Sequence, residues 1–128
     1  MAKRLLIDTD VLIEYLRGRR QAVKFLENQS ASLAVSVITV AELFAGVKGQ
    51  EEHRALEQFL AAFDVLAVTG DVAVQGGFYR RNFGPSHHTS LPDALIAATA
   101  ELHEIPLVTF NVRHFPMLDE VRKPYRKR

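Results

Sequence analysis

The sequence predicts an α/β fold: a three-layer domain with a central, mostly parallel sheet flanked by helices. Short apolar runs bounded by turn or cap residues are typical of buried parallel strands. Amphipathic segments of helical length separate these runs, which favours strand and helix alternation along the chain. The length of 128 residues fits one domain with one core.

The elements follow in order from these patterns. The expected strands are residues 4–7, 33–38, 65–68 and 107–110. The expected helices are residues 11–16, 21–28, 40–47, 51–63, 71–82 and 93–104. The helix over 51–63 has the clearest signal, because its apolar residues Leu56, Phe59, Leu60 and Phe63 recur at helical spacing. Residues 84–92 are polar and bounded by prolines, so we expect an irregular loop there.

Composition excludes several classes of protein. Hydrophobic residues make up 48% and charged residues 24%, which is typical of a folded globular chain. The chain has no cysteine, so disulfides, thiolate zinc sites and thiol nucleophiles are excluded. The apolar run at 5–7 is too short for a signal peptide or a membrane span. We therefore expect a cytoplasmic protein that does not contact a membrane.

The charge is unevenly distributed. The formal net charge of +1 excludes a uniformly basic nucleic-acid binder. Residues 122–128 hold five of the 16 basic residues and no acid, which leaves 11 basic and 15 acidic residues in the remainder. We therefore divide the chain into a domain over 1–121 and a basic C-terminal tail over 122–128. A solvated tail that serves solubility alone is the simpler interpretation of this segment.

Acidic residues follow the expected strands. Asp8 ends the first strand, Glu42 lies soon after the second, and Asp93 opens the helix after the proline-bounded segment. Asp10 and Asn111 stand close to two of these junctions. Ligands of open parallel sheets gather at the carboxyl ends of the strands. Carboxylate-rich sites without cysteine suit hard divalent cations such as Mg²⁺ or Mn²⁺.

Each acid also has a simpler local explanation, because acids are favourable at helix N-termini. Asp8 or Thr9 fits the cap of the first helix. Thr39 and Glu42 have the spacing of a capping box, and Ser90 and Asp93 have a weaker version of it. Helix capping alone thus stays open as an explanation.

Four segments carry a resemblance to a known family. They are residues 5–13 (LLIDTDVLI), 36–43 (SVITVAEL), 91–98 (LPDALIAA) and 107–115 (LVTFNVRHF). In this order and spacing they resemble the successive motifs of PIN-domain ribonucleases, and in particular the VapC toxins of toxin–antitoxin pairs. The resemblance covers nearly the whole chain.

The resemblance implies a PIN-like catalytic domain and a metal-dependent endoribonuclease toxin. It implies that Mg²⁺ or Mn²⁺ is held by Asp8, Glu42 and Asp93, with Asp10 as a further ligand. The fourth acidic position of the family falls on Asn111, an amide, which weakens a second metal position. The hydroxyls that would orient ligands or phosphate are those of Thr9, Thr39 and Thr109.

The implied reaction is hydrolysis of single-stranded or loop RNA, with tRNA or rRNA as the family-level expectation. In-line attack by water leaves a 5′-phosphate and a 3′-hydroxyl. Candidate RNA-binding residues are Arg17, Arg19, Arg20, Arg80, Arg81 and Arg113. Tyr125 is a candidate for stacking on a base. The resemblance also implies an inhibitory VapB-like antitoxin, a homodimer and a toxin–antitoxin hetero-oligomer.

Three other functions are considered. The Asp8 and Asp10 pair also resembles the first motif of haloacid-dehalogenase-type phosphatases, but Leu12 stands where that motif has Thr or Val. A phosphorylatable receiver domain requires an Asp and a Lys where this chain has Thr39 and Asn111. The non-enzymatic alternative is a PIN-like scaffold that binds RNA or protein and uses its acids as caps. His114 is open between an active-site role and a local cap.

Overall fold

The computed structural model describes residues 4–127 and contains one five-stranded parallel sheet in the order β3-β2-β1-β4-β5. The strands are β1 (Arg4–Ile7), β2 (Ser32–Ser36), β3 (Asp64–Leu66), β4 (Leu107–Val108) and β5 (Val121–Arg122). The helices are α1 (Thr9–Leu16), α2 (Arg20–Glu27), α3 (Val37–Ala45), α4 (Gly49–Leu60), α5 (Gly70–His87) and α6 (Leu91–His103), followed by a 3₁₀ turn, η1 (Val112–His114). The predicted α/β class is confirmed.

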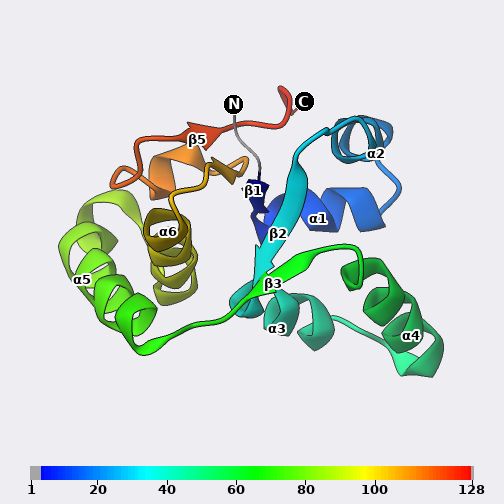
Figure 1. Ribbon diagram of the computed structural model, residues 1–128, viewed down its shortest axis with the longest axis horizontal. Coiled ribbons are helices and arrows are strands. Elements are labelled where there is room, and N and C mark those ends of the chain that lie inside the picture. The colour runs from blue at the N-terminus through cyan, green and yellow to red at the C-terminus, as the bar shows by residue number, and fades with distance from the viewer. Residues whose placement is uncertain (1–3, 128) are drawn as a thin grey trace.

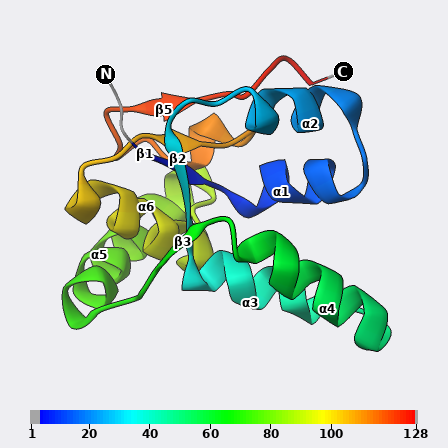
Figure 2. The same cartoon turned by 45° about the vertical axis from the view of Figure 1, so that its right-hand side comes forward.

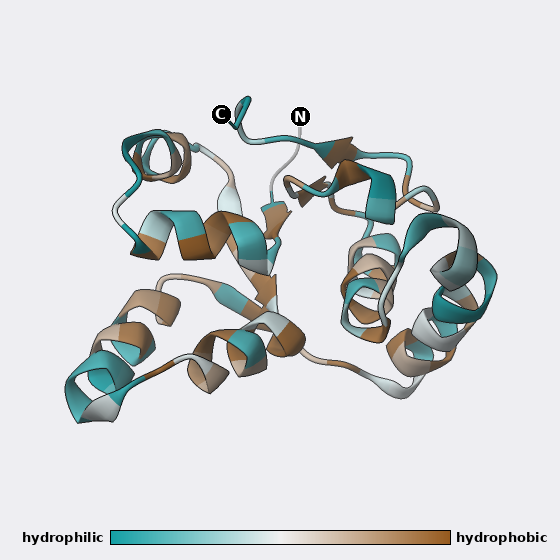
Figure 3. Ribbon diagram, turned by 180° about the vertical axis from the view of Figure 1, so that it is seen from behind, coloured by the Kyte–Doolittle hydropathy of each residue, from teal (hydrophilic) through white to brown (hydrophobic). Residues whose placement is uncertain are grey.

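Helices cover both faces of the sheet, so the domain has three layers. Helices α5 and α6 lie together on one side, and α1 to α4 lie on the other (Figures 1 and 2). Alternate residues of each strand point to opposite faces. Leu6 therefore packs in the cluster with α5 and α6, whereas Leu5 and Ile7 pack in the cluster with α1 to α4. The central strands are accordingly brown in Figure 3, and the first turns of α4 are teal.

The contact between α5 and α6 depends on a small residue. A Cβ atom added at Gly76 would lie 2.6 Å from the Cδ2 atom of Leu95, which is closer than real Cβ contacts. Glycine therefore permits the two helices to approach closely. No helix within residues 4–127 is long and apolar enough to cross a membrane.

Several predicted boundaries differ from the structure by one to five residues. Residues 84–87 are not a loop, because α5 continues through Pro85 to His87 and ends at His88, which has φ 55°. Pro85 lies in the last turn of α5 and has no backbone N–H to donate within the helix. The second strand ends at Ser36, and the Oγ atom of Ser36 caps α3 by accepting a hydrogen bond from the N–H of Ile38 at 3.0 Å.

The strand β5 was not predicted. It contains two residues, which is too short for a periodic pattern to indicate a strand. It pairs with β4, and Arg122, the first residue of the predicted tail, lies in the sheet opposite Val108.

Candidate functional site

The carboxyl ends of β1, β2 and β4 meet at one edge of the sheet, and α1 and α3 begin there directly after their strands (Figure 1). Asp8 follows β1, and Thr109 follows β4. The two residues are in contact because β1 and β4 are neighbours in the sheet. The fold therefore joins the first and the last motif of the sequence at one place.

Asp8 is the buried centre of the site, with 5% of its surface exposed. Its Oδ1 atom accepts a hydrogen bond from the N–H of Thr9 at 2.8 Å, which makes Asp8 the cap of α1. Its Oδ2 atom accepts one from the hydroxyl of Thr109 at 2.7 Å. Burial, followed by the negative charge of Asp10 and more weakly that of Asp93, raises the pKa of Asp8 to about 7.

Asp10 lies beside Asp8 on the first turn of α1. Its Oδ2 atom accepts hydrogen bonds from the backbone N–H of Phe110 at 3.1 Å and from the Nδ2 atom of Asn111 at 3.2 Å. Its Oδ1 atom is buried and has no hydrogen-bond partner in the described part of the chain. Burial raises the pKa of Asp10 above its ordinary value. The unpartnered oxygen is a free ligand position next to Asp8.

Glu42 is held by a threonine from another element. The hydroxyl of Thr9 donates to the Oε1 atom of Glu42 at 2.6 Å and lies 2.9 Å from the hydroxyl of Thr39. Thr39 is fully buried. The predicted capping box of Thr39 with Glu42 is therefore wrong, since Ser36 caps α3 and Glu42 points toward α1.

Asp93 opens α6 and has two partners. With Ser90 it forms the predicted capping box, in which the N–H of Ser90 donates to Asp93 Oδ2 at 3.2 Å and the N–H of Asp93 donates to Ser90 Oγ at 3.1 Å. The Nδ1 atom of His114 lies 3.3 Å from the same Oδ2 atom. The hydroxyl of Thr89 donates to the backbone oxygen of His114 at 2.7 Å, which fixes the turn that carries the histidine.

The donor set fits a hard divalent cation. Four carboxylates and one amide approach one edge of the sheet, and the buried Oδ1 atom of Asp10 lacks a partner within residues 4–127. Burial and repulsion by neighbouring carboxylates raise the pKa of Asp8. Both disfavour its ionised form, and a cation would stabilise that form. Across residues 4–127 no three acidic or histidine side chains stand ready as a complete cation site. Glu42 and Asp93 are instead each engaged by a hydrogen-bond partner.

The predicted RNA-binding arginines do not form one surface. Arg17, Arg19 and Arg20 line a hollow with Tyr125 and Lys127. Arg113 lines a separate hollow with Asn111 and Lys123.

Arg80 and Arg81 are on α5, which packs on the opposite face of the sheet from α1 and α2 (Figure 1). The guanidinium of Arg81 lies over the ring of Phe78, at 4.7 Å from its centroid. The structure therefore separates these two arginines from the group on α1 and α2.

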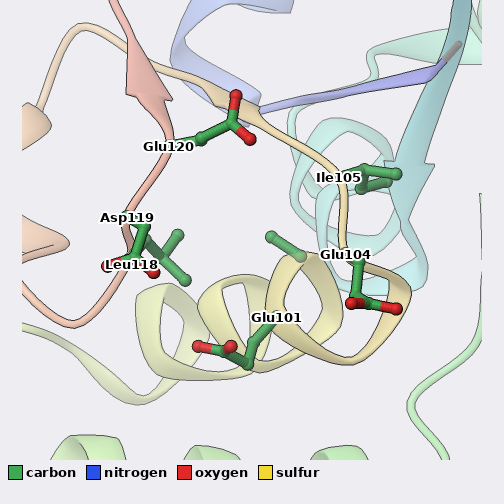
Figure 4. Close-up of a pocket in the computed structure, with 7 residues that line it drawn as sticks. Glu101, Glu104, Ile105, Leu118, Asp119 and Glu120 are labelled. Carbon is green, nitrogen blue, oxygen red and sulfur yellow. The ribbon is translucent and has the colours of Figure 1, made fainter. Parts of the chain in front are cut away.

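A second acidic hollow lies at the opposite edge of the sheet. It has a volume of ≈ 210 Å³ and is formed by the end of α6 and the residues that precede β5 (Figure 4). Its acidic lining residues, all exposed, are Glu101, Glu104, Asp119 and Glu120. Because this is the amino-terminal edge of a parallel sheet, the hollow is separate from the site around Asp8.

Sequence reasoning missed two contributors to the site. The backbone N–H of Phe110 holds Asp10, and no side-chain pattern marks a backbone donor. Thr89 supports His114 through a backbone oxygen, and its position next to Ser90 was its only signal. For His114, which sequence reasoning left open, the contact with Asp93 favours a place at the site.

Comparisons with known proteins agree with this geometry. A model of the PIN domain matches residues 5–121. Ribonuclease VapC10 of Mycobacterium tuberculosis is 39% identical over 124 residues, which cover 94% of this chain and 92% of that protein. Ribonuclease VapC19 of the same organism is 40% identical over 124 residues, with 94% of this chain and 98% of that protein covered.

Solved structures give the same result. A toxin–antitoxin complex from Klebsiella pneumoniae contains a chain with a TM-score of 0.82 and 33% identity, covering 94% of this chain and 98% of that chain. The FitAcB structure from Neisseria gonorrhoeae has a TM-score of 0.77 and 29% identity, covering 94% and 97%. The phosphatase and receiver alternatives are therefore not supported. The chain belongs to the PIN-domain family and, within it, to the VapC ribonucleases.

Proposed function

We propose that this protein is an endoribonuclease toxin that uses Mg²⁺ or Mn²⁺ to hydrolyse phosphodiester bonds in single-stranded or loop RNA. The products are a 5′-phosphate and a 3′-hydroxyl, and a cognate antitoxin inhibits the reaction. The observation that carries this proposal is the pairing of the buried Asp8 with the half-buried Asp10, with one unpartnered oxygen on Asp10 among the described residues and a raised pKa at Asp8.

The ligands of the cation are Asp8, Asp10, Glu42 and Asp93. A divalent cation at such a site makes water more acidic and offsets the negative charge that develops on the phosphoryl oxygens. The residues of the chain keep the ligands in place. Thr109 fixes Asp8, and Thr9 fixes Glu42 through hydrogen bonds of 2.7 and 2.6 Å.

His114 orients Asp93, and Asn111 orients Asp10 through its side-chain amide. Since Asn111 carries no charge, it leaves Asp10 as the anionic group on that side of the site. A bound cation would require the deprotonated forms of Asp8 and Asp10, so it would displace the proton that burial favours on Asp8, whose pKa is about 7.

The test is cleavage of labelled single-stranded RNA by the purified, partner-free protein with Mn²⁺ or Mg²⁺. We expect cleavage that stops with a chelator and in Asp93→Asn, and products degraded by an exonuclease that requires a 5′-phosphate. Products with a 2′,3′-cyclic phosphate would contradict direct hydrolysis. Intact RNA across structured and unstructured substrates would favour the non-catalytic scaffold instead.

An antitoxin has a suitable docking place beside this site. A hollow of ≈ 600 Å³ lies between α1, α3 and α4, and one end of it reaches Glu42. The apolar side chains of Ile13 and Leu16 line it and are 37% and 47% exposed. Such a groove fits the apolar face of a partner helix. An antitoxin helix seated there would be next to the carboxylates.

The variant Leu16→Glu tests the groove. Burying a leucine contributes about 1.5–3 kcal/mol, so we expect antitoxin affinity to fall by roughly 10- to 100-fold while RNA cleavage by the free toxin persists. The matched control is Leu102→Glu, since Leu102 is 48% exposed on α6. Equal co-purification of both variants with the antitoxin would reject this location.

A homodimer is also proposed. Val74 and Phe78 are exposed by 64% and 45% and lie one turn apart on α5, which suits contact with a second copy. Light scattering of the wild type and of Phe78→Glu tests this contact. A monomeric wild type would contradict it.

A further inference from the structure

The basic tail does not leave the domain at the end of β5. In both Figures 1 and 2 it passes from β5 toward α2. The ring of Tyr125 meets the ring of Phe110 edge-on at 5.1 Å, and the Nζ atom of Lys127 lies 4.8 Å from the centroid of the Phe110 ring. The backbone N–H of Phe110 holds Asp10 at 3.1 Å. The tail is thus attached to the residue that supports the carboxylates.

Between this tail and the turn that joins α1 to α2 lies a hollow of ≈ 500 Å³, here called the tail cleft. It is lined by Glu14, Arg17, Arg19, Arg20, Gln21, Tyr125 and Lys127. Four of these side chains are cationic and one is acidic, which gives the lining a formal charge of +3. The chain outside residues 122–128 is acidic overall, so the tail cleft is a local concentration of positive charge.

Glu14 organises the rim of the tail cleft. It is buried, with 7% of its surface exposed, and its Oε2 atom lies 3.9 Å from an Nη atom of Arg17 and 4.0 Å from Nζ of Lys127. The carboxylate therefore connects a cation from α1 with a cation from the tail. Arg19 and Arg20 form no ion pair with an acid within residues 4–127, so their charges are available to a ligand.

Tyr125 supplies a second, independent feature. Its Oη atom is buried and has no hydrogen-bond partner in the described residues, although it belongs to a residue that lines the tail cleft. A buried hydroxyl without a partner costs about 1–3 kcal/mol. An anionic oxygen in the tail cleft would remove this cost by accepting a hydrogen bond from the hydroxyl.

We propose that the tail cleft binds a backbone phosphate of the RNA substrate, adjacent to the phosphate that is cleaved, through Arg19, Arg20 and the hydroxyl of Tyr125. This proposal rests on the proposed function for its substrate. Tyr125, which lines the tail cleft, contacts the ring of Phe110, and the backbone N–H of Phe110 holds Asp10, so the tail cleft lies next to the carboxylate site and one RNA strand reaches both. An acidic carboxylate site repels RNA, and cations next to it offset that repulsion.

The experiment measures RNA binding in the Asp93→Asn background, so that no cleavage is needed. The probe is a fluorescein-labelled oligouridine of about 12 nucleotides, titrated over a series of salt concentrations. Arg19→Gln with Arg20→Gln should weaken binding by roughly 10-fold and reduce the salt slope by about 0.7 for each phosphate that these arginines neutralise. The matched control, Lys48→Gln with Arg54→Gln, removes the same charge from exposed residues at the start of α4 and should bind as the parent does.

The variant Tyr125→Phe tests whether the hydroxyl of Tyr125 binds the ligand or is only buried. If the hydroxyl binds phosphate, affinity falls by roughly 3- to 10-fold with an unchanged salt slope, because no charge is removed. If it is only buried, the variant melts at a higher temperature and binds RNA as before, which overturns the role of Tyr125.

Two further outcomes overturn the proposal as a whole. The first is equal weakening of RNA binding by the Arg19 and Arg20 double variant and by the Lys48 and Arg54 double variant, which indicates an effect of overall charge. The second is that polyglutamate binds more tightly than RNA and that this binding depends on Arg19 and Arg20. That result assigns the tail cleft to an acidic protein segment. If the wild type does not cleave RNA but binds it through Arg19 and Arg20, the proposed function is rejected and the proposal for the tail cleft still holds.

Discussion

The two edges of the sheet both carry carboxylates, but only one edge buries one of them. At the carboxyl-terminal edge Asp8 is 5% exposed, and a threonine hydroxyl and a backbone N–H hold it. At the amino-terminal edge Glu101 accepts a hydrogen bond from Tyr79 at 3.0 Å, and Glu120 pairs with Arg122 at 3.3 Å. The acids of that second edge are exposed. The comparison teaches that clustered negative charge becomes chemically useful where the protein removes water from it.

The largest expected difference between the edges is in activity. Asp8→Asn removes one anionic ligand from the buried edge, so we expect kcat/KM for RNA cleavage to fall by roughly 10³-fold, which is about 4 kcal/mol. Glu104→Gln removes a charge from the exposed edge and should change kcat/KM by less than about 2-fold. Similar losses of kcat/KM in Asp8→Asn and Glu104→Gln would contradict the functional difference between the two edges. Circular dichroism checks that both are folded.

The second difference is in pH dependence without metal. The pKa of Asp8 is about 7 in the folded state against an ordinary value of 3.8, so the folded state binds the proton more tightly. The unfolding free energy should therefore fall as pH rises from about 4 to about 7, by on the order of 2–4 kcal/mol. Asp8→Asn should remove this loss and raise the melting temperature at pH 8 by roughly 5–10 °C.

The control for this prediction is Glu104→Gln, whose melting temperature should follow the wild type across the same pH range. Thr109 can serve the asparagine because its hydroxyl can accept a hydrogen bond as well as donate one. If the melting temperatures of the wild type and of Asp8→Asn change in the same way from about pH 4 to about pH 8, the pKa of Asp8 is not raised in the folded state.

A smaller effect concerns the hydroxyls that hold the ligands. Thr9→Val keeps the shape of the side chain but removes the donor to Glu42, so we expect kcat to fall by roughly 10- to 100-fold. Thr9→Ser should restore most of the activity. At the exposed edge Tyr79→Phe removes the donor to Glu101 and should cost about 1 kcal/mol of stability with unchanged cleavage. Failure of rescue by serine would assign Thr9 a packing role.

The smallest effect is a gain in stability at the exposed edge. Glu104 ends α6 with φ 54°, a left-handed conformation that favours glycine. Glu104→Gly should therefore raise the unfolding free energy by about 0.5–1 kcal/mol, measured by urea denaturation, with no change in RNA cleavage. A loss of RNA cleavage in Glu104→Gly would show that the amino-terminal edge of the sheet affects the site at the carboxyl-terminal edge.

The elements with a strong local pattern were predictable. The strands β1, β2 and β4 are short apolar runs, and α4 repeats apolar residues at helical spacing, so local physics alone indicates them. The meeting of Asp8 with Asp10 and Asn111 followed from the rule that ligands gather at the carboxyl edge of a parallel sheet.

Other features depend on interactions that no local pattern encodes. Spacing suggested that Thr39 caps its helix. The strand ends at Ser36, two residues before its predicted end at residue 38, so Ser36 caps the helix instead. Thr39 is thereby left buried beside Thr9. The attachment of Tyr125 to Phe110 joins two segments that are separated in the sequence, and charge counting showed neither that attachment nor β5.

The pairing of Asp8 with Thr109 has a consequence for synthesis of the protein. The two residues are separated by 101 positions, and β1 reaches its place in the sheet between β2 and β4 only when β4 exists. A nascent chain on the ribosome therefore carries Asp8 and Asp10 long before it carries Thr109, Phe110 and Asn111, which hold them. We therefore expect ribonuclease activity to begin only after the last third of the chain has been translated, which delays cleavage of the cell's own RNA during synthesis.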